Sequence, residues 1–513
     1  MLNPALLDAF ERYRDRVALI YNGRQTTYAD ALDEVYRLAW ALRAQGLRRG
    51  DGIAALTGNS PHAMLVHLAA QLIGCWYAAL PLPVSPAEHA RILRDSEAKA
   101  LVLDPDIDSG LTAGTRASVV FSLGPSEFGE DLIALAAKEA QEPIRPQGRD
   151  DDLAELAYTG GSTSGHPKAA CYTFGRMAAI TEYWQNPRRQ GAPEAAAFGS
   201  EPCRLLRYQP FSQVAGLSVV PALLNGGTIV LHDRFDASAV LRTIEHEHIT
   251  ILVVAPSRLY QLLDDPDLAN TDTSSLRLLV YAGAPTTRTR LAQALNRFGP
   301  ILSQSYGQTE TRMISVLDPA DHSRPELLGS AGRPRQGVEV EIRPADDRQA
   351  VAAGTVGEVC VRSPFTMTGY WRQPELSAKT IRDGWLHTGD LGYLDEDGYL
   401  YLVDRMHDVI MVNGYNCYSF EVEDTLASHP SVCSAAVIGL PDEWSGEAIH
   451  AAVVPRRGAQ VTDDELRDLV REQRGRPFTP RTIHFLAEIP LTPLGKADKP
   501  AVRAELARRL GAR

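Results

Sequence analysis

The residues best suited to phosphate chemistry lie in one loop, Tyr158–Lys168, with the sequence YTGGSTSGHPK. Glycine lets the backbone approach a ligand closely, because it has no Cβ and accepts positive φ. Hydroxyl groups and one lysine add hydrogen-bond donors and a point charge, which together suit a polyphosphate. A flexible Gly/Ser surface loop has the same composition, so both interpretations stay open on this segment alone.

The loop is not a Walker A motif. Gly160 and Gly165 have the G-x-x-x-x-G spacing, but His166 stands where that motif requires lysine, and no G-K-[ST] follows. The sequence therefore disfavours a P-loop NTPase.

Six further motifs follow this loop along the chain. They are YAGAP (281–285), QSYGQTE (304–310), GWLHTGD (384–390), DR (404–405), GYN with EVE (414–416 and 421–423) and PLTPLGK (490–496). Each is weak alone, since Asp390 fits a turn, Glu310 a cap and Lys496 ordinary surface charge. In this order, they resemble the adenylate-forming superfamily, which includes acyl- and aryl-CoA ligases, luciferases and peptide-synthetase adenylation domains. The resemblance spans nearly the whole chain.

The resemblance implies a binding site for ATP. Thr159, Ser162, Thr163 and Lys168 would hold the β- and γ-phosphates, Tyr306 would stack on adenine, and Asp390 and Arg405 would bind the ribose. The nucleotide-binding set that it implies is Thr159, Gly161, Ser162, Thr163, Gly165, Lys168, Gly283, Ala284, Pro285, Ser305, Tyr306, Gly307, Asp390 and Arg405.

Three residues carry the catalytic roles in this resemblance. The family joins a carboxylate to the α-phosphate of ATP and expels pyrophosphate, so negative charge on phosphoryl oxygens must be stabilised. Thr309 would contact the α-phosphate, and Glu310 would hold Mg²⁺, which neutralises phosphate oxygens. Lys496 would reach the carboxylate and the α-phosphate.

The same family transfers the acyl group to a thiol after its C-terminal domain rotates. The resemblance places the hinge at His407, where relatives usually have Asp or Lys. It places the acyl pocket at Gln213, Val214, Gly283 and Ser305. CoA is the expected acceptor, and a carrier-protein phosphopantetheine is the alternative.

The sequence departs from the family pattern at several positions. Ser164 lengthens the phosphate loop by one residue, Ala169 replaces the usual closing glycine, and Ser419 stands where many relatives have Pro. Gln213 replaces a histidine that many CoA ligases have, and it cannot carry charge. Drift and an unusual substrate both explain Gln213. No aspartate holds an α-ammonium in this region, which argues against a free amino acid as substrate.

The elements that must position these residues follow from the pattern of apolar residues. Tyr28–Gln45 has helical spacing and ends before Gly46. Short Val/Ile/Leu-rich runs at 99–104, 153–158, 227–233, 250–256 and 276–283 predict buried strands. Such strands between helices are typical of mainly parallel sheets covered on both faces.

The C-terminal third has a different pattern. Short strands and frequent Gly, Pro and Asp from about residue 329 predict a β-rich subdomain. The tail predicts helices at 420–426, 463–473 and 499–509 and strands at 434–438 and 449–454. We therefore expect an α/β fold, with a large adenylation domain (1–403), a hinge (404–409) and a small mobile α+β domain (410–513).

Composition excludes several other classes. The 513 residues are 44% hydrophobic and carry a net charge of −12, so we expect no nucleic-acid partner. The six cysteines are widely separated, which predicts reduced thiols. The uncharged stretch 64–84 contains two prolines, so a buried helix and strand fit better than a membrane span. We expect a cytoplasmic protein of unassigned oligomeric state.

The leading interpretation is an ATP- and Mg²⁺-dependent ligase that activates an aromatic or medium-sized carboxylic acid and transfers it to CoA. Three alternatives remain. The enzyme loads a carrier protein, or it adenylates nitrite to diazotise an aryl amine, or the chain is a non-catalytic nucleotide- or acyl-binding regulator. Lys496 argues against the last, since binding alone does not require it.

Overall fold

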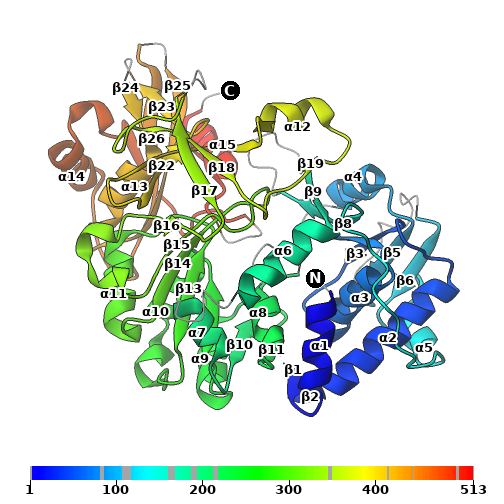
Figure 1. The fold of residues 1–513 in the computed structure, drawn as a ribbon. Coiled ribbons are helices and arrows are strands. Elements are labelled where there is room, and N and C mark those ends of the chain that lie inside the picture. Colours follow the sequence, from blue (N-terminus) through cyan, green and yellow to red (C-terminus); the bar gives the residue numbers. More distant parts are fainter. Residues whose placement is uncertain are drawn as a thin grey trace.

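The computed structural model describes residues 3–80, 86–106, 117–159, 168–186, 193–211, 218–344, 349–412, 415–442, 444–492 and 496–511. Its elements form four sheets (Figure 1). Two large sheets with helices make up the N-terminal part, and two five-stranded sheets follow along the chain.

The first large sheet has nine strands. In spatial order they are β16 (Arg333–Pro334), β15 (Ser315–Leu317), β14 (Leu302–Tyr306), β13 (Leu278–Ala282), β12 (Ile251–Val254), β10 (Arg204–Arg207), β11 (Thr228–Leu231), β1 (Val17–Tyr21) and β2 (Arg24–Thr27). The strands from β14 to β1 pair in parallel, and the edge strands are antiparallel.

The second large sheet has eight strands and the same mainly parallel character. In order they are β19 (Gly369–Tyr370), β9 (Ala169–Thr173), β8 (Leu153–Tyr158), β4 (Trp76–Ala79), β3 (Gly52–Leu56), β5 (Ala100–Leu103), β6 (Val119–Ser122) and β7 (Glu130–Asp131). Only the pairs β19·β9 and β9·β8 are antiparallel.

Helices cover both faces of these sheets. One core cluster joins the two sheets through α1 (Pro4–Arg12), α2 (Tyr28–Ala44), α3 (Pro61–Leu72), α5 (Leu132–Ala136), α6 (Phe174–Gln185), α7 (Pro193–Gly199) and α8 (Val219–Leu224). A second cluster packs α9 (Ala237–His246), α10 (Pro256–Asp264) and α11 (Arg288–Phe298) on the nine-stranded sheet, and a third packs α4 (Pro86–Ser96) on the other. This burial on both faces explains the continuous apolar runs in the strands.

The third sheet is antiparallel and lies between the large sheets and the C-terminal elements in sequence. Its strands are β17 (Glu339–Arg343), β18 (Gly357–Arg362), β20 (Ile381–Arg382), β21 (Trp385–Leu394) and β22 (Leu400–Arg405), with α12 (Pro374–Thr380) between β19 and β20. The β-rich region predicted from residue 329 onward is present.

The fourth sheet carries the C-terminal helices. It contains β24 (Tyr415–Cys417), β23 (Ile410–Val412), β26 (Gly446–Pro455), β25 (Val432–Asp442) and β27 (Thr482–Phe485), with α13 (Ser419–Ala427), α14 (Asp463–Arg474) and α15 (Lys499–Leu510). Figure 1 shows these elements together at one end of the molecule, beside β13–β16 and α11.

The structure confirms the α/β fold and the elements predicted from the apolar pattern. Tyr28–Ala44 is a helix, and Thr27 and Asp30 form a capping box at its start. The stretch predicted as a buried helix and strand forms α3 and β4 in its described part. All six cysteines are free thiols. Within the described ranges, none of the helices combines the length and apolar character that a membrane crossing requires.

Candidate active site

The two ends of the predicted phosphate loop lie at the ends of β8 and β9. The Thr159 amide donates to the Lys168 carbonyl at 2.8 Å, and the Lys168 amide donates to Thr159 Oγ1 at 3.2 Å. These two bonds continue the antiparallel pairing and hold Thr159 beside Lys168. Gly161, Ser162, Thr163 and Gly165 lie outside the described residues.

The QSYGQTE motif leaves β14 through a tight turn. A Cβ at Gly307 would lie 1.7 Å from the Arg312 carbonyl oxygen, so only glycine fits there. Tyr172 of β9 stabilises the turn, because its hydroxyl donates to the Thr309 carbonyl. It therefore presents Thr309 and Glu310 from the end of a buried strand.

Tyr370 connects Glu310 with Lys168. Its hydroxyl donates to Glu310 Oε1 at 2.9 Å, and Lys168 Nζ lies 5.6 Å from the centre of its ring. Burial and the Glu310 carboxylate raise the pKa of Tyr370 well above its ordinary value, so the hydroxyl stays protonated and keeps donating. The carboxylate predicted to bind a metal and the lysine predicted to bind phosphate thus lie on the two sides of one tyrosine.

Asp390 lies at the meeting point of β14, β21 and β22. Tyr306 Oη and Gln308 Nε2 each donate to its Oδ2 at 2.6 Å, and Arg405 Nε lies 3.4 Å from Oδ1. Asp390 and Arg405 are also direct partners in the β21·β22 register. The structure therefore brings together three of the predicted nucleotide residues, with Asp390 in the centre.

Lys496 reaches this site from the segment before α15. Its Cε lies 3.4 Å from where a Cβ on Gly283 would stand, so the lysine chain passes over the end of β13. Burial, followed by the charge of Arg405, lowers the pKa of Lys496 to about 8, while Asp390 and Glu310 oppose this shift. Lys496, the lysine predicted to be catalytic, therefore lies close enough to Arg405, Asp390 and Glu310 for their charges to influence its own.

Four other predicted residues lie at the ends of the same strands. Gly283, Ala284 and Pro285 follow β13, and Gly283 has φ +93°. Ser305 is paired with Ala282 across β13·β14. Gln213 and Val214, predicted to line the acyl pocket, lie outside the described residues.

His407 lies in the turn between β22 and β23 and is exposed. Its ring approaches Gly389, because a Cβ there would lie 4.0 Å from His407 Cε1. The predicted hinge residue is therefore next to the GWLHTGD segment that carries Asp390.

Sequence reasoning missed three residues that support the site. Gln308 lies inside a recognised motif, and its position there was the available signal. Tyr370 gave no such signal. Neither did Arg312, which forms a 2.9 Å ion pair with Glu155 and stacks 4.0 Å from the Tyr172 ring centre.

One carboxylate and one cluster of side chains have the chemistry of metal ligands. Glu310 offers a carboxylate beside the phosphate-loop lysine, and hard oxygen ligands of this kind suit Mg²⁺. The potential ligand atoms of Glu358, Cys360 and His387 (a carboxylate oxygen, Sγ and a ring nitrogen) also lie within 4.8 Å of one another. In that cluster Arg382 Nη2 lies 2.6 Å from His387 Nδ1, so a guanidinium already supplies the positive charge.

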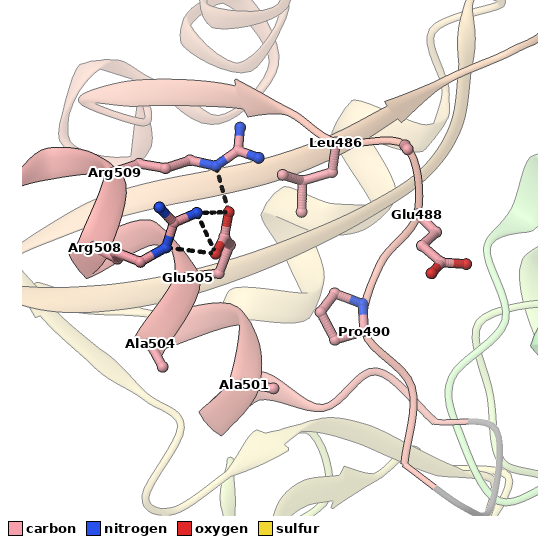
Figure 2. A pocket seen from close by; sticks show the side chains of 9 residues that line it. Leu486, Glu488, Pro490, Ala501, Ala504, Glu505, Arg508 and Arg509 are labelled. Carbon is pink, nitrogen blue, oxygen red and sulfur yellow. Dashed lines mark hydrogen bonds and ion pairs between the residues drawn. The ribbon is translucent and has the colours of Figure 1, made fainter.

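A surface hollow of about 530 Å³ lies on the C-terminal elements, between α15 and residues 486–490 (Figure 2). Glu505 binds Arg508 and Arg509 along its edge. None of the predicted site residues lines it, so it is separate from the space around Lys496.

Comparison with known proteins extends these observations. The AMP-binding enzyme family matches residues 6–371, and the AMP-binding enzyme C-terminal domain matches residues 421–496. The chain is 34% identical to the medium/long-chain-fatty-acid–CoA ligase FadD8 of Mycobacterium tuberculosis, over 97% of this chain and 89% of that protein. It is 35% identical to feruloyl-CoA synthase of Amycolatopsis sp, over 95% of both.

Among solved structures, the amide bond synthetase McbA from Marinactinospora thermotolerans superposes with a TM-score of 0.88. The two are 40% identical, over 98% of this chain and 100% of the other. The chain belongs to the family of AMP-binding, adenylate-forming enzymes.

Proposed function

We propose that this enzyme activates a carboxylic acid with ATP and transfers the acyl group to the thiol of CoA. The observation that carries the proposal is the meeting of Lys496, Glu310, Asp390 and Arg405 around one space at the ends of β13 and β14. Lys496 faces the carboxylates of Glu310 and Asp390 there. This arrangement suits a nucleotide with its metal ion beside the carboxylates and an acid substrate beside the lysine.

In the first step a carboxylate oxygen attacks the α-phosphorus, the bond from that phosphorus to the β-phosphate bridging oxygen breaks, and pyrophosphate leaves. Asp390 and Arg405 fix the ribose, while Thr159 and Lys168 hold the outgoing phosphates. Lys496 neutralises charge on the carboxylate and α-phosphate oxygens as they come together. Glu310 would hold Mg²⁺, which supplies charge neutralisation when bound.

In the second step the thiol sulfur attacks the acyl carbon. The bond from that carbon to the AMP oxygen breaks, AMP leaves, and the thiol proton passes to solvent. We propose that residues 404–409 form a hinge between an adenylation domain (residues 1–403) and a mobile domain (residues 410–513). Rotation at His407 would remove Lys496 and open the acyl carbon to the thiol.

An amine is the second candidate acceptor. The identity of 40% to an amide bond synthetase exceeds the 34% and 35% to the two CoA ligases. The first step is then unchanged, and an amine nitrogen replaces sulfur as the attacking atom.

The test is ATP-dependent pyrophosphate release against a panel of carboxylic acids, with CoA, with an amine, and with neither. Separate reactions contain a phosphopantetheinylated carrier protein, or nitrite with an aryl amine. We expect release with at least one acid and a CoA thioester when CoA is present. Formation of an amide without a thioester would show that an amine, and not CoA, accepts the acyl group. Release only with nitrite and the aryl amine would overturn carboxylate activation.

The matched control in this experiment is Lys496→Ala. We expect pyrophosphate release to fall to background while ATP binding, measured by calorimetry, stays within about threefold, because the lysine acts on the reacting oxygens. Release at the wild-type rate would refute the role of Lys496.

A further inference from the structure

A buried ion pair lies beside the site and contains none of the residues predicted to bind the nucleotide. Arg335 Nη1 lies 2.5 Å from Glu194 Oε2, and Nη2 lies 3.1 Å from Oε1. Their side chains are 2% and 4% exposed. Glu194 comes from α7, and Arg335 directly follows β16, so residues 141 positions apart meet inside the N-terminal core.

Arg335 also holds the face of β14. Its Nη2 donates to Ser305 Oγ at 3.0 Å, and its Nη1 contacts Tyr183 Oη at 3.2 Å. Ser303 Oγ donates to Glu194 Oε1 at 3.4 Å. Since alternate residues of a strand share one face, Ser303 and Ser305 both point toward this ion pair.

Aromatic rings close the space behind it. The Tyr183 ring packs edge-on against Phe365 at 5.1 Å and against Trp184 at 5.4 Å. Trp184 in turn packs against Phe198 of α7. The space between α6, α7 and β14 is therefore filled by a charged pair that is backed by rings.

Ser305 lies between the Arg335–Glu194 pair and the residues proposed to surround the reacting atoms. Ser305 precedes Tyr306, which binds Asp390, and it pairs with Ala282 next to Gly283, over which Lys496 passes. An acid whose carboxylate meets Lys496 must extend its body away from the ribose side. The face of Ser305 is one wall available to that body.

We propose that the Arg335–Glu194 pair closes the inner end of the acyl pocket and selects compact acids, such as one-ring aromatic acids, over long unbranched fatty acids. This inference rests on the proposed activation of a carboxylic acid. A long chain would have to displace two paired charges that are also hydrogen-bonded to the hydroxyl groups of Tyr183, Ser303 and Ser305, and separating a buried pair is strongly unfavourable.

The test compares acids by ATP–pyrophosphate exchange in the full-length enzyme. The acids are benzoate, cinnamate, hexanoate, octanoate, decanoate and dodecanoate. The variant is the double substitution Glu194→Ala with Arg335→Ala, which removes both charges and their volume. We expect the ratio of kcat/KM for decanoate to that for the best aromatic acid to rise at least tenfold, while the KM for ATP stays unchanged.

One further variant separates size from charge, and a second serves as a control. Glu194→Gln keeps the volume, so we expect the ratio to stay within about twofold of wild type. The matched control removes an ion pair at the opposite ends of the strands, through Arg204→Ala with Glu247→Ala. We expect that control to leave the ratio unchanged.

An unchanged ratio in a folded double-alanine variant that still activates acids would overturn the inference. If that variant does not fold, Glu194→Leu with Arg335→Met keeps the volume without charge, and it should raise the ratio at least threefold because a flexible apolar wall can yield. No rise there would also overturn it. Failure of wild type with every acid would instead refute the proposed function.

Discussion

Asp390 shows how single residues prepare this site before a nucleotide binds. Its carboxylate is held by a tyrosine, a glutamine and an arginine that come from two other strands and a turn. We expect a carboxylate held in this way to need little reorganisation when it binds the ribose, as proposed. The same carboxylate also fixes Tyr306.

We expect Asp390→Ala to weaken ATP binding by about 10- to 100-fold. A hydrogen bond to a charged group contributes about 1.5–3 kcal/mol, and each 1.4 kcal/mol corresponds to about tenfold in affinity. Titration calorimetry with ATP and Mg²⁺ measures the change. Tyr306→Phe, which keeps the carboxylate, should lose less, and unaltered affinity in Asp390→Ala would exclude a ribose role.

We expect Lys496 to give the enzyme an alkaline limit of activity. Its pKa is lowered to about 8, so the ammonium is present below this pH and is lost as pH rises through it. We expect kcat/KM for ATP to fall about tenfold for each pH unit above 8. Lys496→Arg keeps a charged group at these pH values, so whatever activity it retains should lack this decline. A decline of equal slope in Lys496→Arg would assign the titration to another group.

Some of these contacts were predictable from the sequence, and others were not. The motifs located Tyr306, Asp390, Arg405 and Lys496, because each has a fixed place in a short pattern. The Arg335–Glu194 pair joins residues 141 positions apart and has no local pattern. It arises where α7 packs beside β14 and beside the segment that follows β16.

At the scale of elements, apolar periodicity located the helices and strands well, since burial on both faces imposes it. The connection between β22 and α13 was less evident. Asp404 Oδ2 accepts from the Ser419 amide at 2.6 Å and from Ser419 Oγ at 2.8 Å. A proline at position 419 has no amide hydrogen, so this tie depends on the departure from the usual residue.

Lys499, at the start of α15, completes that connection. Its Nζ lies 3.2 Å from Glu423 Oε1 and also binds Ser419 Oγ. The Glu423 side chain is 16% exposed, and it accepts from the Val437 amide at 2.8 Å. Burial raises the pKa of Glu423, although Lys499 opposes the shift.

We expect Lys499→Met to lower the free energy of unfolding of the C-terminal part by about 3–5 kcal/mol at pH 7, because a buried charge loses its partner. The folded-state pKa of Glu423 is raised, so its charged form costs stability as pH rises, and the loss should shrink toward pH 5. Urea unfolding at both pH values measures this. Adding Glu423→Gln should restore most of the stability; no recovery would place the effect elsewhere.

At the scale of the whole molecule, polar contacts between described residues connect the C-terminal elements to the nine-stranded sheet and its helices. The Arg288 amide donates to Asp424 at 3.3 Å, Arg290 Nη2 lies 3.4 Å from Cys433 Sγ, and Arg456 lies 3.6 Å from Asp264. Polar interfaces of this kind permit relative motion. They are consistent with the proposed rotation about residues 404–409.

We expect His407→Pro to separate the two steps, because proline fixes φ at the proposed hinge. Pyrophosphate release in a single turnover should stay within about twofold of wild type, whereas thioester formation should fall at least 100-fold. Quench-flow detection of both products measures the split. His407→Ala, which keeps backbone freedom, should support both steps, and equal losses in both steps of His407→Pro would refute the hinge.

The paired bonds between Thr159 and Lys168 have a consequence for evolution and engineering. They fix the register of β8 and β9 at the base of the phosphate loop, whatever the number of residues between them. We therefore expect loops of different length, taken from relatives and grafted between these two residues, to leave the register of the sheet unchanged.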